Sequence, residues 1–181
     1  MSALLSDRTW TIVVAAVWTL AVAIVGGLLT EVGPWYESLN FPRLRPPNWL
    51  FAPAWTVIFT LTAAAGVIAW EHTSPDDRPA LLVAFAVNSI LNVLWSPLFF
   101  KLKRPDWALY ELVPFWLSVA VLVFVTGRAS SLAGWLTVPY LAWVTFAGWL
   151  NWRMVQLNKP FGRRAGEALA GGVDAYGRRS R

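Results

Sequence analysis

Tryptophan is the residue type in this sequence that is best suited to contact with a flat ligand. The chain carries 13 tryptophans among 181 residues. An indole ring is large, flat and apolar with one N–H donor, so it suits pocket walls as well as membrane–water boundaries. Trp55, Trp95 and Trp143 lie at least one helical turn inside hydrophobic runs and are therefore the candidates for a binding site. Boundary anchoring can explain the tryptophans near the ends of such runs, namely Trp10, Trp49, Trp70, Trp107 and Trp135.

Each candidate tryptophan belongs to a helical face that also carries small or polar groups. Residues three and four positions apart share a face of a helix. This spacing groups Phe51, Trp55, Phe59, Thr62 and Gly66, then Asn88, Asn92, Trp95 and Phe99, and finally Trp143, Ala147, Leu150 and Asn151. Such faces are typical of an apolar pocket with few polar contacts, but small and amide residues also join helices within membranes. Both interpretations are open at this point, although Asn88 and Asn92 are expected to face the protein interior because unpaired amides in lipid are costly.

Several other kinds of site are excluded by composition. The chain has no cysteine and a single histidine, His72, so thiolate metal sites, Cys nucleophiles and paired-histidine metal or haem sites are unavailable within one chain. No carboxylate pair, Ser/His/Asp set or glycine-rich phosphate loop is present. Glu111 is the one carboxylate inside a hydrophobic run. It could face a pocket or pair with a basic residue, but we expect it to extend to the nearby membrane boundary.

The hydrophobic runs themselves predict the fold. The chain is 57% hydrophobic and 14% charged, whereas soluble domains carry about 25% charged residues. A helix that crosses a bilayer needs about 20 predominantly apolar residues and satisfies its own backbone hydrogen bonds. The sequence therefore predicts an all-α membrane protein, a five-transmembrane-helix bundle with helices at about 10–30, 49–70, 80–100, 107–126 and 132–154. These helices make one domain, residues 1–158, which a basic and flexible tail at 159–181 follows.

The connections predict a lid and an orientation. The first loop, residues 32–48, is long and carries Trp35, Tyr36 and Phe41, so we expect it to pack over one mouth of the bundle. Lysine and arginine are unevenly divided, with twelve on the side of the first loop and the C-terminus and three, Arg8, Arg78 and Arg128, on the other. Cytoplasmic segments are enriched in these residues, which predicts a cytoplasmic first loop and C-terminus and an external N-terminus. The net charge of +5 is interpreted as anchoring to anionic lipid, not as binding of nucleic acid.

Ordered motifs over residues 33 to 157 resemble the tryptophan-rich sensory protein family, also called the translocator protein or peripheral benzodiazepine receptor (TspO/MBR) family. They are Trp35-Tyr36-x-x-Leu39-x-x-Pro42, Pro46-Pro47-x-Trp49-x-x-x-Pro53-x-Trp55, Asn92-x-x-Trp95-x-Pro97-x-Phe99-Phe100, Trp107-Ala108-Leu109, and Pro139-Tyr140-Leu141-Ala142-Trp143 followed by Leu150-Asn151. The Pro-x-Trp and Pro-Tyr-Leu-x-Trp blocks are the most specific. The sterol motif of animal members needs a tyrosine after the Leu-Asn pair, and Trp152 stands there instead.

The resemblance implies a five-helix bundle, usually a homodimer, in a bacterial or organellar membrane; we expect the bacterial cell membrane. It implies binding of protoporphyrin IX or another tetrapyrrole, with no required cofactor or metal, and a role in tetrapyrrole and stress responses. Matched position by position, the ligand-binding residues would be Tyr36, Trp55, Asn92, Trp95, Trp107, Trp143, Ala147 and Leu150. Trp55 and Trp143 match two tryptophans that the family links to light- and oxygen-dependent porphyrin breakdown, which makes them the candidate catalytic residues.

Three functions are compatible with these residues. The first is a membrane receptor or sensor that binds a porphyrin beneath the first loop. The second is an enzyme that degrades porphyrin, in which Trp55 and Trp143 would donate electrons or hydrogen to the excited or oxidised ring. The third is a porphyrin transporter, which the absence of an internal sequence repeat makes the weakest of the three.

Overall fold

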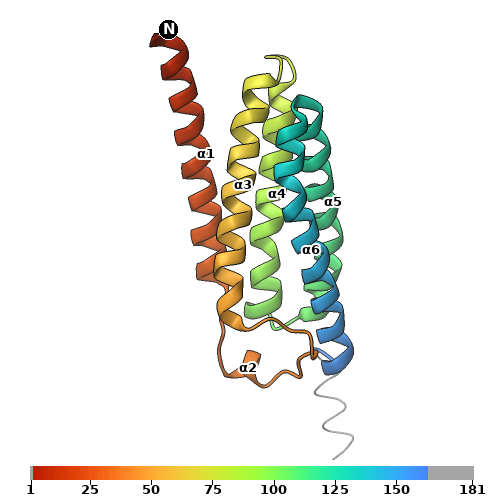
Figure 1. Cartoon of the computed structure of the whole chain (residues 1–181). Coiled ribbons are helices and arrows are strands. Elements are labelled where there is room, and N and C mark those ends of the chain that lie inside the picture. Colours follow the sequence, from red (N-terminus) through yellow and green to blue (C-terminus); the bar gives the residue numbers. More distant parts are fainter. Residues whose placement is uncertain (1, 163–181) are drawn as a thin grey trace, which may run out of the picture.

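The computed structural model describes residues 2–162, and the side chains of residues 7–162. Most of the tail expected at 159–181 therefore lies outside the described residues. Five long helices account for most of the described chain: α1 (Ser2–Leu29), α3 (Phe51–His72), α4 (Arg78–Ser96), α5 (Pro105–Ala129) and α6 (Ser131–Asn158). Shorter elements are α2 (Pro34–Glu37), the 3-10 turn η1 (Asn48–Leu50) and the π-helical turn η2 (Pro97–Lys101). The all-α prediction is confirmed for this part of the chain, in which no strand occurs (Figure 1).

Four of the described helical segments are long and apolar enough to cross a membrane. They are Asp7–Leu29, Asn48–His72, Arg78–Lys101 and Pro105–Ala129. The fifth predicted crossing, on α6, is not among them, although α6 is 28 residues long. The sequence of α6 gives the reason, because tryptophans, Thr137, Pro139 and Tyr140 interrupt its aliphatic residues and lower its mean hydropathy.

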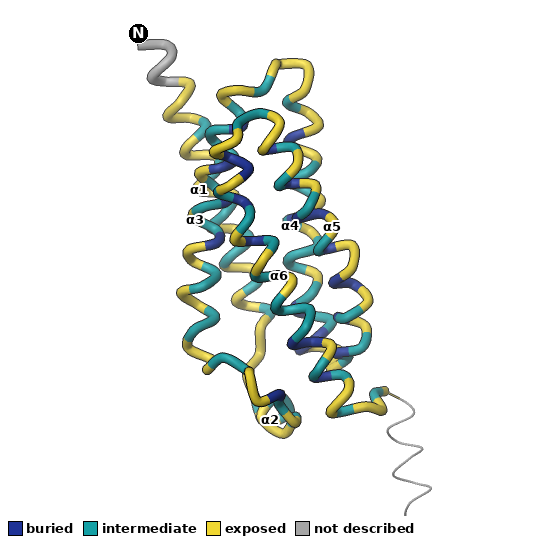
Figure 2. The backbone as a smooth tube through the Cα atoms, turned by 45° about the vertical axis from the view of Figure 1, so that its right-hand side comes forward, coloured by how far each residue is buried: buried dark blue, intermediate teal, exposed yellow. Residues whose placement is uncertain are grey.

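The hydrophobic core lies where α3, α4, α5 and α6 face one another. Its buried residues include Phe115, Leu122, Tyr140 and Val144, and Figure 2 shows the buried positions concentrated on these inward faces. By contrast, α1 stands on the outside of the bundle, and its membrane-span window contains no buried residue. It is held to α4 by the Trp18 Nε1–H, which donates to Ser89 Oγ over 2.8 Å.

The two groups of connections lie at opposite ends of the bundle. The first loop, the α4–α5 connection and the end of α6 share one end, whereas the N-terminus, the α3–α4 turn and the α5–α6 turn share the other (Figure 1). The counted basic residues on the side of the first loop that the structure describes therefore gather at one end, as their order in the sequence predicts; the arginines beyond residue 162 lie outside the described residues.

The α5–α6 turn depends on two facing glycines. A Cβ atom added to Gly134 would lie 2.8 Å from the Cα of Gly127, which is closer than carbon atoms can pack. This contact lets the two backbones approach closely just before and after the turn.

Gly134→Ala is expected to lower the free energy of unfolding by about 1–3 kcal/mol, because overpacking against rigid backbone forces the helices apart. Thermal unfolding of the detergent-solubilised protein, followed by circular dichroism, measures this. Gly26→Ala is the matched control, since a Cβ there would meet nothing within 4 Å. Equal melting temperatures for the two variants would contradict the prediction.

Candidate ligand-binding site

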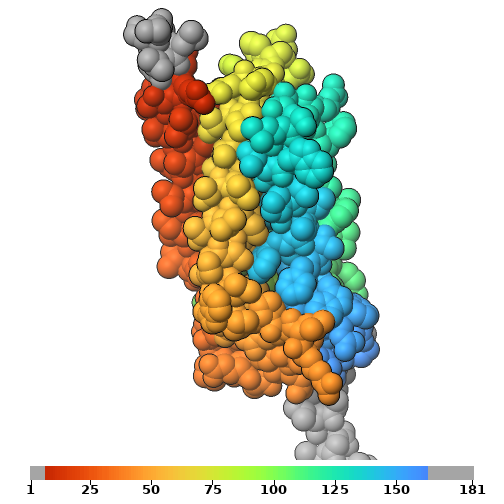
Figure 3. Space-filling model, in the orientation of Figure 1, coloured from red at the N-terminus to blue at the C-terminus, as the bar shows by residue number. Residues whose placement is uncertain are grey.

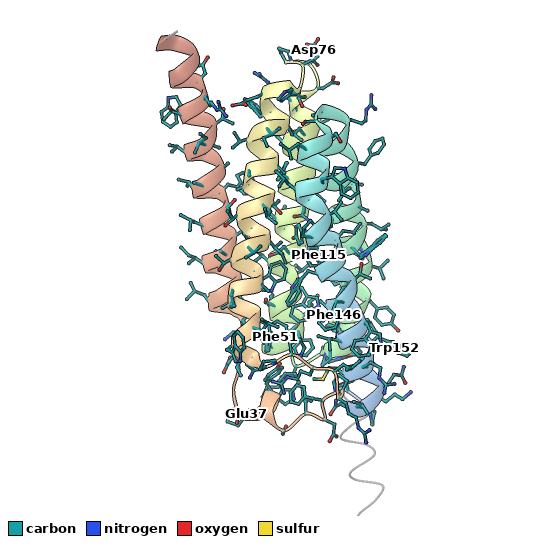
Figure 4. The ribbon with its side chains drawn as sticks, viewed as in Figure 1. Glu37, Phe51, Asp76, Phe115, Phe146 and Trp152 are labelled. Atoms are coloured by element: carbon teal, nitrogen blue, oxygen red, sulfur yellow. The ribbon has the colours of Figure 1, made fainter. Side chains whose placement is uncertain are left out.

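Trp55 on α3 and Trp143 on α6 meet inside the bundle. Their ring centroids lie 6.4 Å apart at an interplanar angle of 79°, an edge-to-face contact. Phe51 contacts Trp143 at 5.7 Å, and Phe59 stacks on Trp55 at 5.1 Å. Figure 4 shows Phe51 on α3 and Phe146 on α6 close to the end that carries the first loop. Both tryptophans are half-buried, so part of each residue is not covered by protein.

Trp95 on α4 links this aromatic group to a second one. Its ring stacks on Phe99 at 4.9 Å and meets the edge of Phe100 at 6.0 Å. Trp95, Trp55 and Trp143 all pack against the core cluster that contains Phe115 and Tyr140. Trp95 also packs against the cluster formed by Phe99, Phe100, Ala108 and Met154. The three candidate tryptophans therefore converge on one core from three helices, as the position of each inside a hydrophobic run predicts.

A chain of hydrogen bonds crosses the same core. The Asn92 amide donates to the Tyr140 hydroxyl over 2.9 Å, and that hydroxyl donates to Asn88 Oδ1 over 3.2 Å. The Asn88 amide donates to Ser118 Oγ over 3.0 Å, and Ser118 donates to the Phe115 carbonyl over 2.7 Å. The expectation that both asparagines face the interior is confirmed, because these bonds pair their amides within α4, α5 and α6.

Tyr140 is the site residue that sequence reasoning did not single out. Its ring meets the edge of Trp55 at 5.9 Å, while its hydroxyl holds Asn92. One side chain thus contacts two predicted ligand-binding residues on two different helices. The sequence signal was present, since a tyrosine in the middle of a hydrophobic run needs a partner for its hydroxyl.

The first loop packs against the end of the bundle, as expected. Tyr36 contacts Phe41 at 5.1 Å and Phe100 at 5.5 Å, and the Arg45 guanidinium lies 3.5 Å from the centre of the Phe41 ring. Burial raises the pKa of the Tyr36 phenol above its ordinary value, so this phenol stays neutral at pH 7. Figure 3 shows the loop as a continuous surface beneath α3 and α6.

Two hydrogen bonds fasten this loop to the last turn of α6. The Asn40 backbone N–H donates to Asn158 Oδ1 over 2.7 Å, and Asn158 Nδ2 donates to the Asn40 carbonyl over 2.9 Å. We call this pair of bonds the Asn40–Asn158 clamp.

The remaining predicted ligand-binding residues are placed differently. Ala147 is half-buried and Leu150 is buried, both on α6 beyond Trp143. Trp107 is 47% exposed, and the Arg104 guanidinium lies 4.2 Å from its ring centre. No ring contact joins Trp107 to the other predicted residues among the side chains the structure describes. Its place near the start of α5 fits the boundary position that its place in the sequence also indicates.

Glu111 does not extend to the membrane boundary, and that expectation was wrong. It lies on the buried face of α5 with Ala108, Leu112 and Phe115, and it is 8% exposed. The helical period causes this placement, since these residues recur at intervals of three and four. Neither carboxylate oxygen has a hydrogen-bond partner among the described residues. The same part of the chain contains no group of three or more His, Cys, Asp or Glu residues that could hold a metal ion.

Comparison with known proteins gives consistent matches. The sequence pattern of the TspO/MBR family matches residues 13–157. The tryptophan-rich protein TspO of Chlorobaculum tepidum is 37% identical over 145 residues, which cover 77% of this chain and 90% of that protein. The tryptophan-rich sensory protein of Cereibacter sphaeroides is 36% identical over 132 residues, 73% of this chain and 82% of that one. The translocator protein of Bos taurus is 35% identical over 138 residues, 75% and 80% of the two chains.

Tyr140→Phe is expected to lower the free energy of unfolding by about 1–3 kcal/mol, because it removes the donor to Asn88 Oδ1 and the acceptor of the Asn92 amide N–H. Chemical or thermal unfolding in detergent measures the loss. Tyr110→Phe on α5 is the control, since Tyr110 is 77% exposed and its hydroxyl bonds to no described residue. If both variants unfold at the same temperature, the hydrogen-bond chain does not stabilise the core.

Proposed function

Because this chain belongs to the TspO/MBR family, whose members are integral multi-pass membrane proteins, we propose that it is a membrane receptor for porphyrins, such as protoporphyrin IX, or related hydrophobic ligands. Its role would be in tetrapyrrole and stress regulation. The observation that carries the proposal is the contact between Trp55 and Trp143 from two helices, with both residues only half-buried. Flat apolar surfaces of this kind suit a flat macrocycle.

The ligand would lie beneath the first loop, against Trp55, Trp143 and Trp95, with Asn92 as a polar contact. Tyr36, Ala147 and Leu150 would border the same space, and Trp107 would reach it only by turning away from Arg104. A metal-free porphyrin needs no axial ligand, which fits a chain without cysteine and with only His72.

Basic residues at the end that carries the first loop would meet the propionates of a porphyrin. Lys101 pairs with Glu31 at 2.8 Å, and Arg104 donates to Asp106 over 2.7 Å, so their charges are already engaged. Arg43 and Lys103 are exposed, and neither forms an ion pair with any residue in the described part of the chain. They are therefore the best candidates for the propionate contacts.

We also propose the membrane arrangement that this receptor would have. It includes α6 as the fifth crossing, since α6 packs antiparallel to α5 along the bundle (Figure 1). The first loop and the C-terminus would lie in the cytoplasm of a bacterial cell, and the N-terminus outside, because the basic residues gather at that end. A homodimer is part of the proposal, and α1 offers a surface for it, because Val13, Val17 and Leu20 on α1 are exposed.

Titration of the purified protein with protoporphyrin IX tests the receptor function. The double variant Trp55→Phe/Trp143→Phe is expected to raise the Kd roughly ten-fold, since each replacement of indole by phenyl removes about 0.7 kcal/mol of stacking. The Soret absorbance of the porphyrin is the readout, because it does not depend on the number of tryptophans. Trp135→Phe is the control, as Trp135 is on α6 but 71% exposed. An unchanged Kd in the double variant would place the ligand elsewhere.

Porphyrin degradation is the second candidate, and one contact favours it. Trp55 touches both Trp143 and Tyr140, so three oxidisable rings form a continuous series. Such rings could relay single electrons from a light-excited porphyrin to oxygen, so that the porphyrin is oxidised, oxygen is reduced and the rings return to their starting state.

Under illumination in air, the wild type is expected to convert bound protoporphyrin IX to a new product, and Trp55→Phe/Trp143→Phe is expected to slow this conversion at least ten-fold. Absorbance spectra and mass spectrometry of the extracted pigment measure it, at porphyrin concentrations that saturate both proteins. Samples kept dark or without oxygen are the controls. Equal bleaching by both proteins would leave only the receptor function.

A further inference from the structure

Glu111 is a buried acidic group for which the described protein provides no partner. The residue is 8% exposed, and both of its carboxylate oxygens are buried without a hydrogen bond. A carboxyl group removed from water without a partner is costly, most of all within a membrane. Its neighbours in the core do not share this condition, because Asn88, Asn92, Ser118 and Tyr140 are all hydrogen-bonded.

The position of Glu111 connects it to the candidate site. On α5 it lies between Ala108, which packs in the cluster with Phe99, and Leu112, which packs in the cluster with Tyr140. Trp95 packs against both of these clusters. Glu111 therefore lies beside the core that the three candidate tryptophans surround.

A second unpaired polar atom belongs to this core. The Trp95 Nε1–H is buried and has no acceptor among the described residues. An indole N–H can only donate, whereas a carboxylate can only accept. The core thus presents an unpaired acceptor group on α5 and an unpaired donor on α4, next to flat apolar rings, and the Thr62 hydroxyl on α3 is also buried without a partner among the described residues.

We propose that Glu111 is a ligand-binding residue, which accepts a hydrogen bond from a protonated amine or N–H group at the edge of a flat apolar ligand. This rests on the site proposed above and adds a chemical preference to it. Hydrogen bonds between a charged amine and a carboxylate are about twice as strong as neutral ones. The site therefore favours flat hydrophobic amines over neutral compounds of the same shape.

Two fluorescent probes of matched shape test the proposal. 1-Pyrenemethylamine and 1-pyrenemethanol share a flat apolar body and differ in the ammonium or hydroxyl group at its edge. Both are titrated against the full-length protein in phosphatidylcholine nanodiscs, with empty nanodiscs subtracted to remove partitioning into lipid. The wild type is expected to bind the amine roughly ten-fold more tightly than the alcohol.

Glu111→Gln keeps the side-chain shape but removes the negative charge, so this variant is expected to bind both probes equally. Glu37→Gln is the matched control and is expected to keep the ten-fold preference, because Glu37 is exposed in the first loop, at the outer end of the molecule (Figure 4). If Glu111→Gln does not fold, Glu111→Asp keeps a carboxylate on a shorter stem and is expected to show a reduced preference.

The outcomes separate this inference from the proposed function. Equal binding of the two probes by the wild type, or an undiminished preference in Glu111→Gln, overturns the role of Glu111 and leaves the aromatic site standing. If the wild type binds neither probe while protoporphyrin IX does bind, the role of Glu111 is overturned in the same way. If protoporphyrin IX and both probes all fail to bind, the aromatic site itself is wrong.

Discussion

The hydrogen bonds of the Tyr140 hydroxyl are the interaction on which the rest of the bundle depends. Within a bilayer, polar side chains find partners only inside the protein. The Tyr140 hydroxyl bonds α6 to Asn88 and Asn92 of α4, and Asn88 is also hydrogen-bonded to Ser118 of α5. Because hydrogen bonds require particular distances and angles, this chain fixes the register of three helices more strictly than aliphatic packing does. The register of the three helices in turn sets the positions of the aromatic rings around this chain of hydrogen bonds.

Aromatic packing then builds outward from this polar centre. Trp55 packs against the ring of Tyr140, and Trp143 packs against Trp55. Trp95 connects the core to the rings beneath the first loop. The relatives that share this sequence pattern carry names that refer to tryptophan richness, sensing or translocation. A site made of indole surfaces with few polar groups is consistent with the recognition of a flat, hydrophobic molecule.

Much of this arrangement could be predicted from the sequence, because it follows from periodicity. Five long apolar runs predict five long helices, and spacings of three and four place Asn88, Asn92 and Trp95 on one inward face. Periodicity also contains the information that Glu111 shares a face with Ala108 and Phe115, but the general tendency of charged groups to reach water was given more weight. The position of Trp107 is ambiguous in the same way, since a residue at a helix end can turn toward either the core or the boundary.

Other features depend on contacts between distant segments of the chain and could not be predicted from the sequence. Nothing local predicts that Tyr140 joins Trp55 to Asn92, or that Asn40 meets Asn158, 118 residues further along the chain. The hydropathy of α6 is also a poor guide, because it leaves α6 out of the candidate membrane spans although α6 packs within the bundle. Thr137, Tyr140 and Asn151 make it less apolar than its neighbours, and these three side chains are buried in the core.

The Asn40–Asn158 clamp has a mechanical consequence. The side-chain amide of Asn158 pairs with both the backbone N–H and the backbone carbonyl of Asn40, so one side chain holds both polar backbone groups of this loop residue. Asn158 is the last residue of α6. Any outward movement of the first loop would therefore also release the last turn of α6, so the clamp couples the position of the loop to the position of the end of α6.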